Sequence, residues 1–240
     1  MFARSLMMAG GQRQILVTIA ASVRNPNIAA LAAAQGWNGS QLIQVTINSG
    51  VDVAALSISG IGANQLHIVN NGRIGGIRGV GNGDTGGTGL YTRTPIRVTN
   101  NGTIFGAGGG GGRGDGAAFS KNGGYYEATG GFGGFGAGFR DQASPVVFDA
   151  AAAGGGGMSI QYDGAIGGGQ ERPYANSAGG GAGGAIGQNG AAGSAGANFG
   201  GSYDGASIIP GQSGGLAGYY VDGNSYITWL VTGTRLGRVI

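Results

Sequence analysis

The sequence has no cysteine, and it has only five prolines and one histidine among 240 residues. The lack of cysteine excludes disulfides and thiolate metal sites. Five prolines are too few for collagen, which needs about a fifth of its residues to be proline or hydroxyproline. Charged residues make up 10% of the chain, against about a quarter in an average protein. Because the few arginines are spread along the chain, nucleic acid is not an expected partner.

Long apolar runs are also missing. No stretch reaches the roughly 20 apolar residues that span a membrane, and the segment from Met1 to Ala9 lacks the apolar centre of a signal peptide. We therefore expect synthesis in a cytoplasm and no membrane insertion. Hydrophobic residues still make up 41% of the chain, which is more than a disordered region carries.

Glycine is abundant, with 60 residues, and its spacing is regular. Six glycines recur at every third position from residue 181 to residue 196, namely Gly181, Gly184, Gly187, Gly190, Gly193 and Gly196. A period of three is that of the polyproline II helix. A glycine face lets neighbouring extended helices approach closely. The pattern predicts a bundle of polyproline II helices, a polyproline II sandwich, with loops at its ends.

Segments rich in other residues interrupt the glycine blocks after residue 106. We interpret them as loops that a rigid glycine scaffold holds in place. The four loops favoured as a binding surface are 120–129, 140–150, 170–177 and 198–210.

The first hundred residues have a different pattern, with short apolar strands separated by Asn-Gly or Ser-Gly turns. The segment from His67 to Ile74 resembles the segment from Arg97 to Ile104, thirty residues later, and 45–51 is a looser copy. Repeats at this spacing predict stacked coils, as in a β-helix or β-prism. Further strands are expected at 14–22, 42–47, 51–58, 66–69, 74–80, 95–98 and 103–105.

One short helix is expected between these strands. Asn25 is a suitable N-cap, Pro26 suits the first helical position, and Gly36 suits the C-terminal stop. The fold class is therefore mainly β with a polyproline II bundle. We expect an attachment segment over 1–40, a β-repeat and oligomerisation domain over 41–105, a glycine-rich domain over 106–218 and C-terminal strands over 219–240.

Aromatic residues in or beside the predicted loops suggest a recognition surface, since tyrosine offers a large contact area at low entropic cost. The candidate binding residues, two arginines of the same loops included, are Tyr125, Tyr126, Arg140, Phe148, Arg172, Tyr174, Phe199 and Tyr203. The alternative is that the rings cover the glycine scaffold and form its hydrophobic core. For a single one of these rings the two interpretations are equally favoured, whereas Phe132, Phe135 and Phe139 follow the glycine period and are expected in the core.

Motifs that would indicate an enzyme are weak. The glycine runs lack the Gly-Lys-Ser/Thr ending of a phosphate-binding loop, and the lone His67 is better explained as a structural residue. The carboxylates are sparse and fit turns. The tripeptide Arg113-Gly114-Asp115 arises easily by chance in a glycine-rich chain. We expect neither catalysis nor a cofactor nor a bound metal.

The sequence from Val98 to Gly112, followed by glycine blocks, resembles phage tail proteins. Together with the ending from Ile227 to Gly237, it is similar to the glycine-rich receptor-recognition region of lambda-like host-specificity proteins. A more distant likeness is to the glycine-rich tail-fibre adhesin of T-even-like phages, a polyproline II sandwich whose loops contact the receptor. The resemblance covers about residues 40 to 240. This chain is much shorter than the lambda-like proteins.

The resemblance implies a virion protein of the distal tail, made in the host cytoplasm, that recognises a host outer-membrane protein or surface glycan. It further implies contact with other tail proteins through the N-terminal segment, and we expect a homotrimer. The alternatives are a non-adhesive tail component, such as a tip cap or fibre connector, and an ice-binding or surface-coating protein. A glycan depolymerase would need a catalytic constellation that the sequence does not display.

Overall fold

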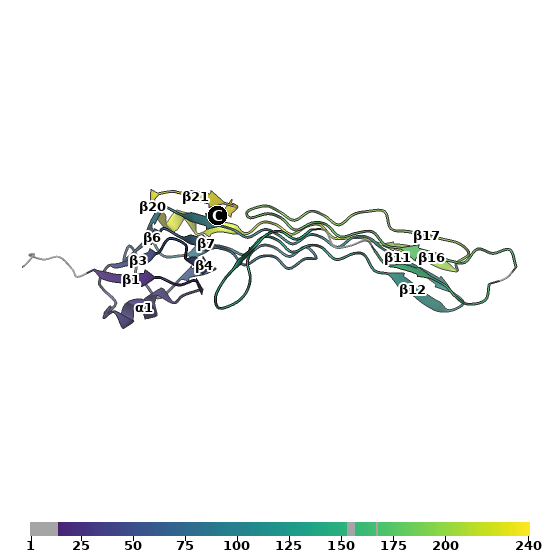
Figure 1. Ribbon diagram of the computed structural model, residues 1–240, viewed down its shortest axis with the longest axis horizontal. Coiled ribbons are helices and arrows are strands. Elements are labelled where there is room, and N and C mark those ends of the chain that lie inside the picture. Colours follow the sequence, from purple (N-terminus) through teal and green to yellow (C-terminus); the bar gives the residue numbers. More distant parts are fainter. Residues whose placement is uncertain (1–13, 153–156, 167) are drawn as a thin grey trace, which may run out of the picture.

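The computed structural model describes residues 14–152, 157–166 and 168–240, which form a long rod (Figure 1). The base of the rod is a β-domain formed by residues 14–75, 90–105 and 219–240. A shaft of extended glycine-rich segments leads from the base to a small β-domain, the tip, at the far end. Short strands and one α-helix are present in the described residues, so the predicted mainly β class is confirmed.

The base is a parallel β-helix of five coils with three sheets. The first sheet contains β1 (Ile15–Ile19), β3 (Ile43–Ile47), β6 (Leu66–Asn70), β9 (Ile96–Asn100) and β20 (Ile227–Val231). The second contains β2 (Val23–Arg24), β4 (Asp52–Ala54), β7 (Arg73–Gly75), β10 (Thr103–Phe105) and β21 (Thr234–Leu236). The third contains β5 (Leu56–Ile58), β8 (Leu90–Thr92), β19 (Tyr219–Asp222) and β22 (Arg238–Val239). A 3-10 turn, η1 (Asn224–Tyr226), leads into β20.

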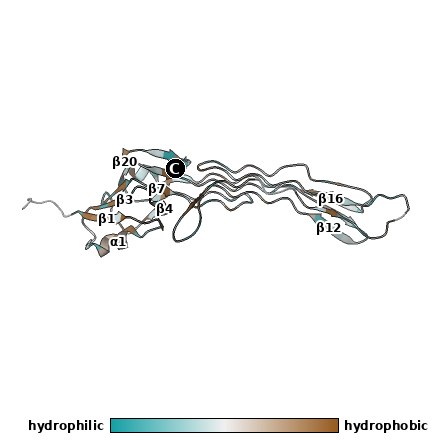
Figure 2. Ribbon diagram, viewed as in Figure 1, coloured by the Kyte–Doolittle hydropathy of each residue, from teal (hydrophilic) through white to brown (hydrophobic). Residues whose placement is uncertain are grey.

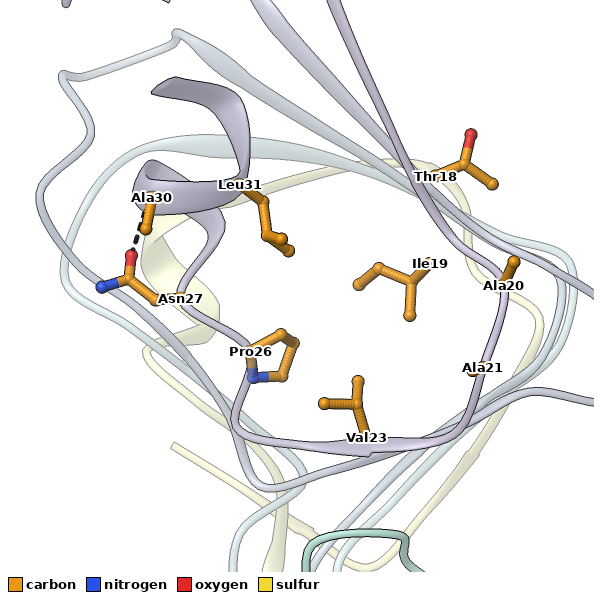
Figure 3. Close-up of a pocket in the computed structure, with 9 residues that line it drawn as sticks. All are labelled: Thr18, Ile19, Ala20, Ala21, Val23, Pro26, Asn27, Ala30 and Leu31. Atoms are coloured by element: carbon orange, nitrogen blue, oxygen red, sulfur yellow. Dashed lines mark hydrogen bonds between the residues drawn. The ribbon is translucent and has the colours of Figure 1, made fainter. Parts of the chain in front are cut away.

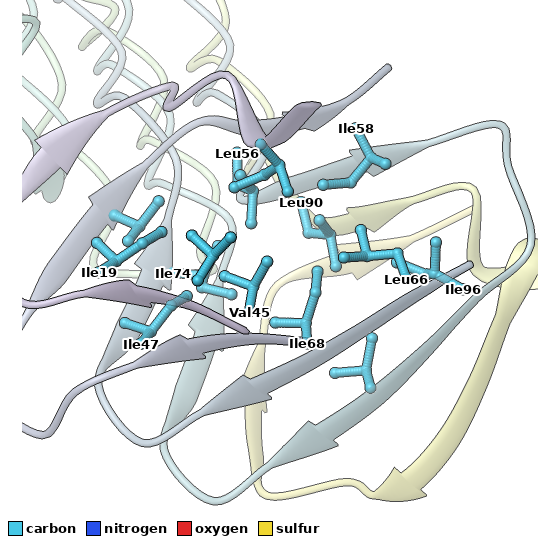
Figure 4. Close-up of a cluster of buried hydrophobic side chains, with 14 of the residues drawn as sticks. Ile19, Val45, Ile47, Leu56, Ile58, Leu66, Ile68, Ile74, Leu90 and Ile96 are labelled. Atoms are coloured by element: carbon cyan, nitrogen blue, oxygen red, sulfur yellow. The ribbon is translucent and has the colours of Figure 1, made fainter. Parts of the chain in front are cut away.

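Alternation along the strands builds the core of the base. In β3, for example, Ile43, Val45 and Ile47 are fully buried, while the side chains between them are partly exposed. The inward residues of successive coils stack on one another and fill the prism with aliphatic side chains (Figure 4). One coil alone could not bury these faces, so the stacking of coils stabilises the base.

The thirty-residue repeat of the sequence is the repeat of this β-helix. His67 pairs in register with Arg97, and Asn70 pairs with Asn100. Both asparagines are fully buried at the corner between the first two sheets. The Asn70 side-chain amide donates to the Asn100 side-chain oxygen at 2.7 Å, and the Asn100 amide donates to the Thr232 carbonyl at 2.8 Å. The Asn-Gly turns are thus the corners of consecutive coils.

The helix α1 (Ile28–Ala34) takes the place of a third strand in the first coil. Its N-cap is Asn27, whose side-chain oxygen accepts the Ala30 amide at 3.0 Å, so the predicted cap at Asn25 was wrong by two residues. Asn25 instead has a φ of 42°. The predicted stop at Gly36 is confirmed, because the Gly36 amide donates to Ala33 and the Trp37 amide to Ala32. These two bonds form a Schellman motif.

Several strand boundaries of the base also differ from the prediction. The segment 51–58 forms two strands, because Ala55 turns the chain at a corner with a φ of 52°. The strand expected over 74–80 ends at Gly75, where the chain leaves the β-helix. The strand expected over 95–98 runs from Ile96 to Asn100.

The shaft is built from two insertions into the β-helix: residues 76–89 lie in the third coil, between β7 and β8, and residues 106–218 lie in the fourth coil and also form the tip. In the fourth coil the chain leaves after β10, forms residues 106–218, and re-enters as the third-sheet strand β19. The two ends of the insertion are adjacent, since a Cβ placed on Gly106 would lie 2.0 Å from the Gly218 carbonyl oxygen. Residues 219–240, predicted as a separate C-terminal segment, pair in parallel with β8, β9 and β10. They complete the β-helix that begins at β1.

A glycine-rich helix of residues 107–115 forms the centre of the shaft. Hydrogen bonds join it to six surrounding segments. Its amides donate to carbonyls of 131–137, 188–194 and 84–87, and its carbonyls accept amides from 178–184, 212–218 and 79–83. The bonds recur at every third residue. Gly108, Gly111 and Gly114, for example, donate in turn to Ala137, Gly134 and Gly131. Isolated polyproline II helices have no internal hydrogen bonds, so these neighbours satisfy the buried backbone.

The uninterrupted run Gly108–Gly112 follows from this central position. A Cβ on Gly108 would lie 2.0 Å from the Gly184 oxygen, one on Gly109 would lie 2.1 Å from the Gly215 oxygen, and one on Gly110 would lie 2.7 Å from the Gly81 amide nitrogen. Each successive glycine therefore faces a different neighbour. The outer helices keep glycine only on the faces that touch another helix, which gives the period of three.

The shaft has few large side chains, and Figure 2 shows it as a pale region between the more strongly coloured base and tip. Close contact of backbones and hydrogen bonding replace the usual core of aliphatic side chains. Phe132 and Phe135, predicted as core residues, are instead exposed on the outside, while Phe139 is buried against Phe105 with ring centroids 5.1 Å apart.

The tip contains two three-stranded antiparallel sheets. One has the order β12 (Gly124–Ala128), β11 (Gly116–Lys121), β18 (Gly205–Ile209), and the other has the order β15 (Ser159–Gln161), β16 (Tyr174–Asn176), β17 (Asn198–Gly200). A short pair, β13 (Gly138–Phe139) and β14 (Val147–Phe148), lies on the connection beside the base.

His67 gives the base a predicted pH dependence. Burial, and to a lesser degree the charge of Arg97, lower the pKa of His67 below its ordinary value of 6.5. The folded protein thus favours the neutral ring. The contribution of the neutral His67 ring to the free energy of unfolding is complete above pH 6.5. It is lost as the pH falls from 6.5 through the lowered pKa. Replacing His67 by glutamine, the residue of the preceding coil at Gln44, is expected to reduce the fall in melting temperature between pH 7.5 and pH 5.0. The difference is expected to be about 2–4 °C at most.

The melting temperatures of both proteins at the two pH values check this expectation. An equal fall in the wild type and the variant would contradict it.

Candidate functional site

The tip is held together by a small core between its two sheets. Ala117, Phe119, Ala128 and Ala175 are buried there, and partly buried aromatic rings pack around them. Phe119 stacks on Tyr126 with ring centroids 5.0 Å apart. Tyr162 from the second sheet meets Tyr126 edge to face at 5.6 Å. The two sheets therefore form a compact domain at the end of the shaft.

The predicted loops at this end are mostly strands. The segment 120–129 is the hairpin of β11 and β12, the segment 170–177 includes β16, and the segment 198–210 includes β17 and β18. Their interruption of the glycine blocks favoured loops, but pairing across the tip makes them strands. The connecting turns remain, among them Asn122-Gly123, where both residues have positive φ.

The structure divides the predicted tip aromatics into two groups. Tyr126 and Phe199 pack against the core. The exposed group consists of Tyr125, with 64% of its surface exposed, Tyr174, with 39%, and Tyr203, with 41%. Alternation along β12 explains the contrast, since Tyr126 faces Phe119 in the core and its neighbour Tyr125 faces outward. Arg172 is also exposed, and it lies 4.0 Å from an Asp163 oxygen.

Two predicted residues lie far from the tip. Arg140 and Phe148 belong to the connection 138–150, which lies beside the base (Figure 1). There the Arg24 amide donates to the Ala143 carbonyl, and the Arg24 side chain pairs with Asp141. The segment 140–150 was grouped with the tip because residue composition does not reveal at which end of a rod a turn lies.

Arg140 and Phe148 lie beside another cation, Arg78. The Arg78 guanidinium lies 4.6 Å from the Phe135 ring centre and 4.9 Å from that of Phe148. Arg140 approaches Phe148 at 5.8 Å. Burial, and then the charge of Arg140, lower the pKa of Arg78. Stacking on aromatic faces stabilises such cations and fixes the connection against the shaft.

Sequence reasoning missed two exposed apolar residues of the tip. Met158 is 53% exposed, just before β15, and Ile208 on the edge strand β18 is 42% exposed. The sequence Ala-Ser-Ile-Ile at 206–209 carried a strand signal that the neighbouring glycines obscured. Both residues enlarge the apolar part of the tip surface.

An open apolar hollow lies at the opposite end of the rod. It has a volume of about 470 Å³ and lies between the end of β1 and the start of α1. In Figure 3, Ile19, Val23, Pro26 and Leu31 surround it. It falls within the predicted attachment segment 1–40, of which residues 1–13 lie outside the described residues.

The described residues contain no group of three or more histidine, aspartate or glutamate side chains placed to hold a metal ion. No helix in the same residues is long and apolar enough to cross a membrane. Gly114 of the Arg-Gly-Asp tripeptide is buried in the shaft, and the Asp115 side chain accepts the Gly211 amide at 2.6 Å. That tripeptide is part of the scaffold.

Comparison with known proteins gave two findings. The model of a family described as phage tail fibre adhesin Gp38 matches residues 14–240. The chain is similar to the crystal structure of the gp37-gp38 adhesin tip complex of the bacteriophage S16 long tail fiber. The identity is 20%, the TM-score is 0.45, and the match covers 95% of this chain and 83% of that chain. No curated protein sequence gave a significant match.

Proposed function

Because the chain belongs to the phage tail fibre adhesin Gp38 family, we propose that its tip is the surface that contacts the host receptor. The family makes the chain an adhesin of the virion tail, rather than an ice-binding protein or a non-adhesive connector. The specific likeness to lambda-like host-specificity proteins stays a proposal, as does synthesis in the host cytoplasm.

One observation carries the assignment to the tip. Tyr125, Tyr174 and Tyr203, with Met158 and Ile208, are exposed on a small domain that lies at the far end of a rigid shaft from the base. Exposed apolar and aromatic groups that gather on one small domain are typical of interaction sites. Because the shaft holds the tip rigidly, little ordering entropy is lost on binding. Several copies on a particle would add avidity.

The charges of the tip favour one class of receptor. In its described residues the tip has two cations, Lys121 and Arg172, and four carboxylates, Glu127, Asp163, Glu171 and Asp204. An acidic tip is repelled by phosphate-rich or acidic polysaccharide. We propose an outer-membrane protein loop or a neutral surface glycan as the receptor, bound without cleavage.

The base is proposed to attach the adhesin to another tail fibre protein. Support comes from the family and from the position of the base, which lies at the opposite end of the rod from the tip. The apolar hollow between β1 and α1 is the contact surface that we propose. One chain alone closes the three sheets and buries their core. The predicted homotrimer therefore stays a proposal about the assembled particle.

Replacement of Tyr125 and Tyr174 by alanine tests the assignment to the tip. Exposed interface tyrosines often contribute more than about 1 kcal/mol each, so phage carrying both changes are expected to adsorb about 30-fold more slowly or worse. The measurement is the adsorption rate on the strain on which the phage forms plaques.

Tyr91→Ala is the matched control, because Tyr91 is 39% exposed, as Tyr174 is, but lies on β8 of the base. Incorporation of each variant into particles is checked by immunoblot. Normal adsorption of the double variant would exclude these residues from the binding surface.

A further inference from the structure

The turn between β11 and β12 is tied to both sheets of the tip by side chains from other segments. Asn122 and Gly123 connect β11 and β12, with φ values of 49° and 75°, as in the tight turn of a two-residue hairpin. The Asn122 amide donates to the Asp204 carboxylate at 2.7 Å. The Asn122 side chain donates to the Tyr162 hydroxyl at 2.9 Å.

Asp204 occupies the centre of this network. Its own amide donates to the Ser120 carbonyl at 2.9 Å, so residue 204 is held beside the hairpin by its backbone as well. Its second carboxylate oxygen lies 3.8 Å from the Lys121 ammonium. The Lys121 side chain is only 11% exposed, so Asp204 balances a largely buried charge. Charge-assisted hydrogen bonds of this kind are about twice as strong as neutral ones.

The network joins three parts of the chain that are distant in sequence. Asn122 belongs to the first sheet, Tyr162 follows β15 of the second sheet, and Asp204 lies on the connection from β17 to β18. The exposed rings Tyr125 and Tyr203 lie within three residues of two of these anchors. The small apolar core also joins the two sheets.

We infer that Asp204 is a positioning residue: by holding the Asn122-Gly123 turn, it fixes the tyrosines of both segments as one preformed binding surface. This inference rests on the proposed function of the tip. Without the Asp204 carboxylate the Asn122 backbone amide and Lys121 lose their partner. The Asn122-Gly123 turn then becomes more mobile relative to the 203–204 segment, which stays joined to Ser120 by its backbone. The receptor must then order the hairpin on binding, which lowers affinity without removing any contact residue.

Three variants separate the contributions of the Asp204 carboxylate and the Tyr162 hydroxyl to adsorption. Asp204→Ala removes both interactions and is expected to lower the adsorption rate and to raise the rate of release from host cells about tenfold. Asp204→Asn keeps a neutral acceptor for the Asn122 amide and is expected to restore most of the adsorption. Tyr162→Phe removes the hydroxyl but keeps the ring against Tyr126, and about a threefold loss is expected. Asp84→Ala, which changes an exposed aspartate of the shaft, is the control.

Hydrogen exchange of the free protein provides a readout that a general loss of stability would not reproduce. In Asp204→Ala, exchange is expected to quicken in the peptide that contains residues 120–126, while peptides of the shaft and base exchange as in the wild type. Unchanged exchange of that peptide, or wild-type adsorption of Asp204→Ala, would overturn the inference. Should Asp204→Ala fold poorly, Tyr162→Phe and Asp204→Asn provide the same test.

The outcome also distinguishes this inference from the function on which it rests. If Tyr125→Ala with Tyr174→Ala abolishes adsorption and Asp204→Ala does not, the tip binds the receptor and the positioning role is wrong. If none of these variants changes adsorption, the tip itself is the wrong surface.

Discussion

Replacing Gly111 by alanine is expected to unfold the shaft and the tip while the base stays folded. Gly111 lies in the central helix, where an added Cβ would lie 2.0 Å from the Gly181 oxygen, 2.5 Å from the Gly181 carbonyl carbon and 2.8 Å from the Ala182 oxygen. All three are backbone atoms, so no side chain can rotate away. The expected loss is about 3 kcal/mol or more, at or above the upper end of ordinary overpacking.

Relaxation around the added methyl group would break hydrogen bonds. The Gly111 amide donates to the Gly134 carbonyl, and the Gly111 carbonyl accepts the Gly83 amide. A shift of the central helix away from residue 181 also strains its bonds at 109 and 112, because all of its neighbours are tied at three-residue intervals. Buried backbone groups left without partners each cost about 1–3 kcal/mol. The shaft cannot adapt as a core of flexible side chains does.

Gly205→Ala is the matched control for the same chemical change. Gly205 begins β18, and a Cβ there would meet nothing within 4 Å. Limited proteolysis and thermal unfolding measure both variants. We expect early cleavage between residues 106 and 218 in Gly111→Ala and wild-type behaviour in Gly205→Ala. A protease-resistant shaft in Gly111→Ala would contradict the close packing of backbones around the central helix.

The parts of the fold that sequence reasoning predicted are those in which one physical constraint acts at every repeat. Glycine at every third residue indicated helix contact on both sides of Gly187, although the chain turns at Gly187 and the predicted single helix is two adjacent ones. The thirty-residue spacing of Asn70 and Asn100 indicated stacked coils. Each signal is local and recurs. Alternating apolar residues in β3 and β6 likewise indicated strands with one buried face.

Features that depend on distant segments were not predictable in the same way. The five glycines from Gly108 to Gly112 were recognised as a run, but nothing local shows that six segments surround them. The strands of the tip are short and rich in small residues, and their pairing partners lie up to about ninety residues away, as for β11 and β18. The cap at Asn27 was missed because Asn25 and Pro26 carry an equally good local signal.

In the candidate site, too, local signals were predictable and features that depend on distant segments were not. Residue type identified Tyr125, Tyr174 and Tyr203 as candidates, and the structure places them together on the tip domain. Whether a tyrosine is exposed or packed, as Tyr126 is, depends on strand alternation that the predicted loops lacked. The position of Arg140 and Phe148 beside the base depends on the direction in which each shaft helix runs. Their role in receptor contact remains a prediction.

Excision of residues 107–217, together with residues 77–86 of the third-coil insertion, is expected to leave a folded base that attaches to the fibre and to abolish adsorption. Gly106 and Gly218 lie next to each other, and so do Gly76 and Gly87, because a Cβ on Gly76 would lie 1.9 Å from the Gly87 oxygen, so each pair can be joined directly. The larger hydrophobic core draws all its buried residues from 15–104 and from Tyr220 and Val221, and it stays intact. Phe105 loses its contact with Phe139 and is changed to serine in the same variant, so that the new surface is polar.

The excised protein separates attachment from recognition in one experiment. Mixed with wild-type adhesin during assembly, it is expected to compete for fibre ends and to lower adsorption in proportion to its share of the protein. Calorimetry checks that the base still unfolds in one cooperative transition. A base that aggregates would mean that the shaft is needed for folding of the fourth coil. Particles that adsorb normally with only the excised protein would mean that the receptor is bound by the β-helix, and the acidic, tyrosine-bearing tip would then need another explanation.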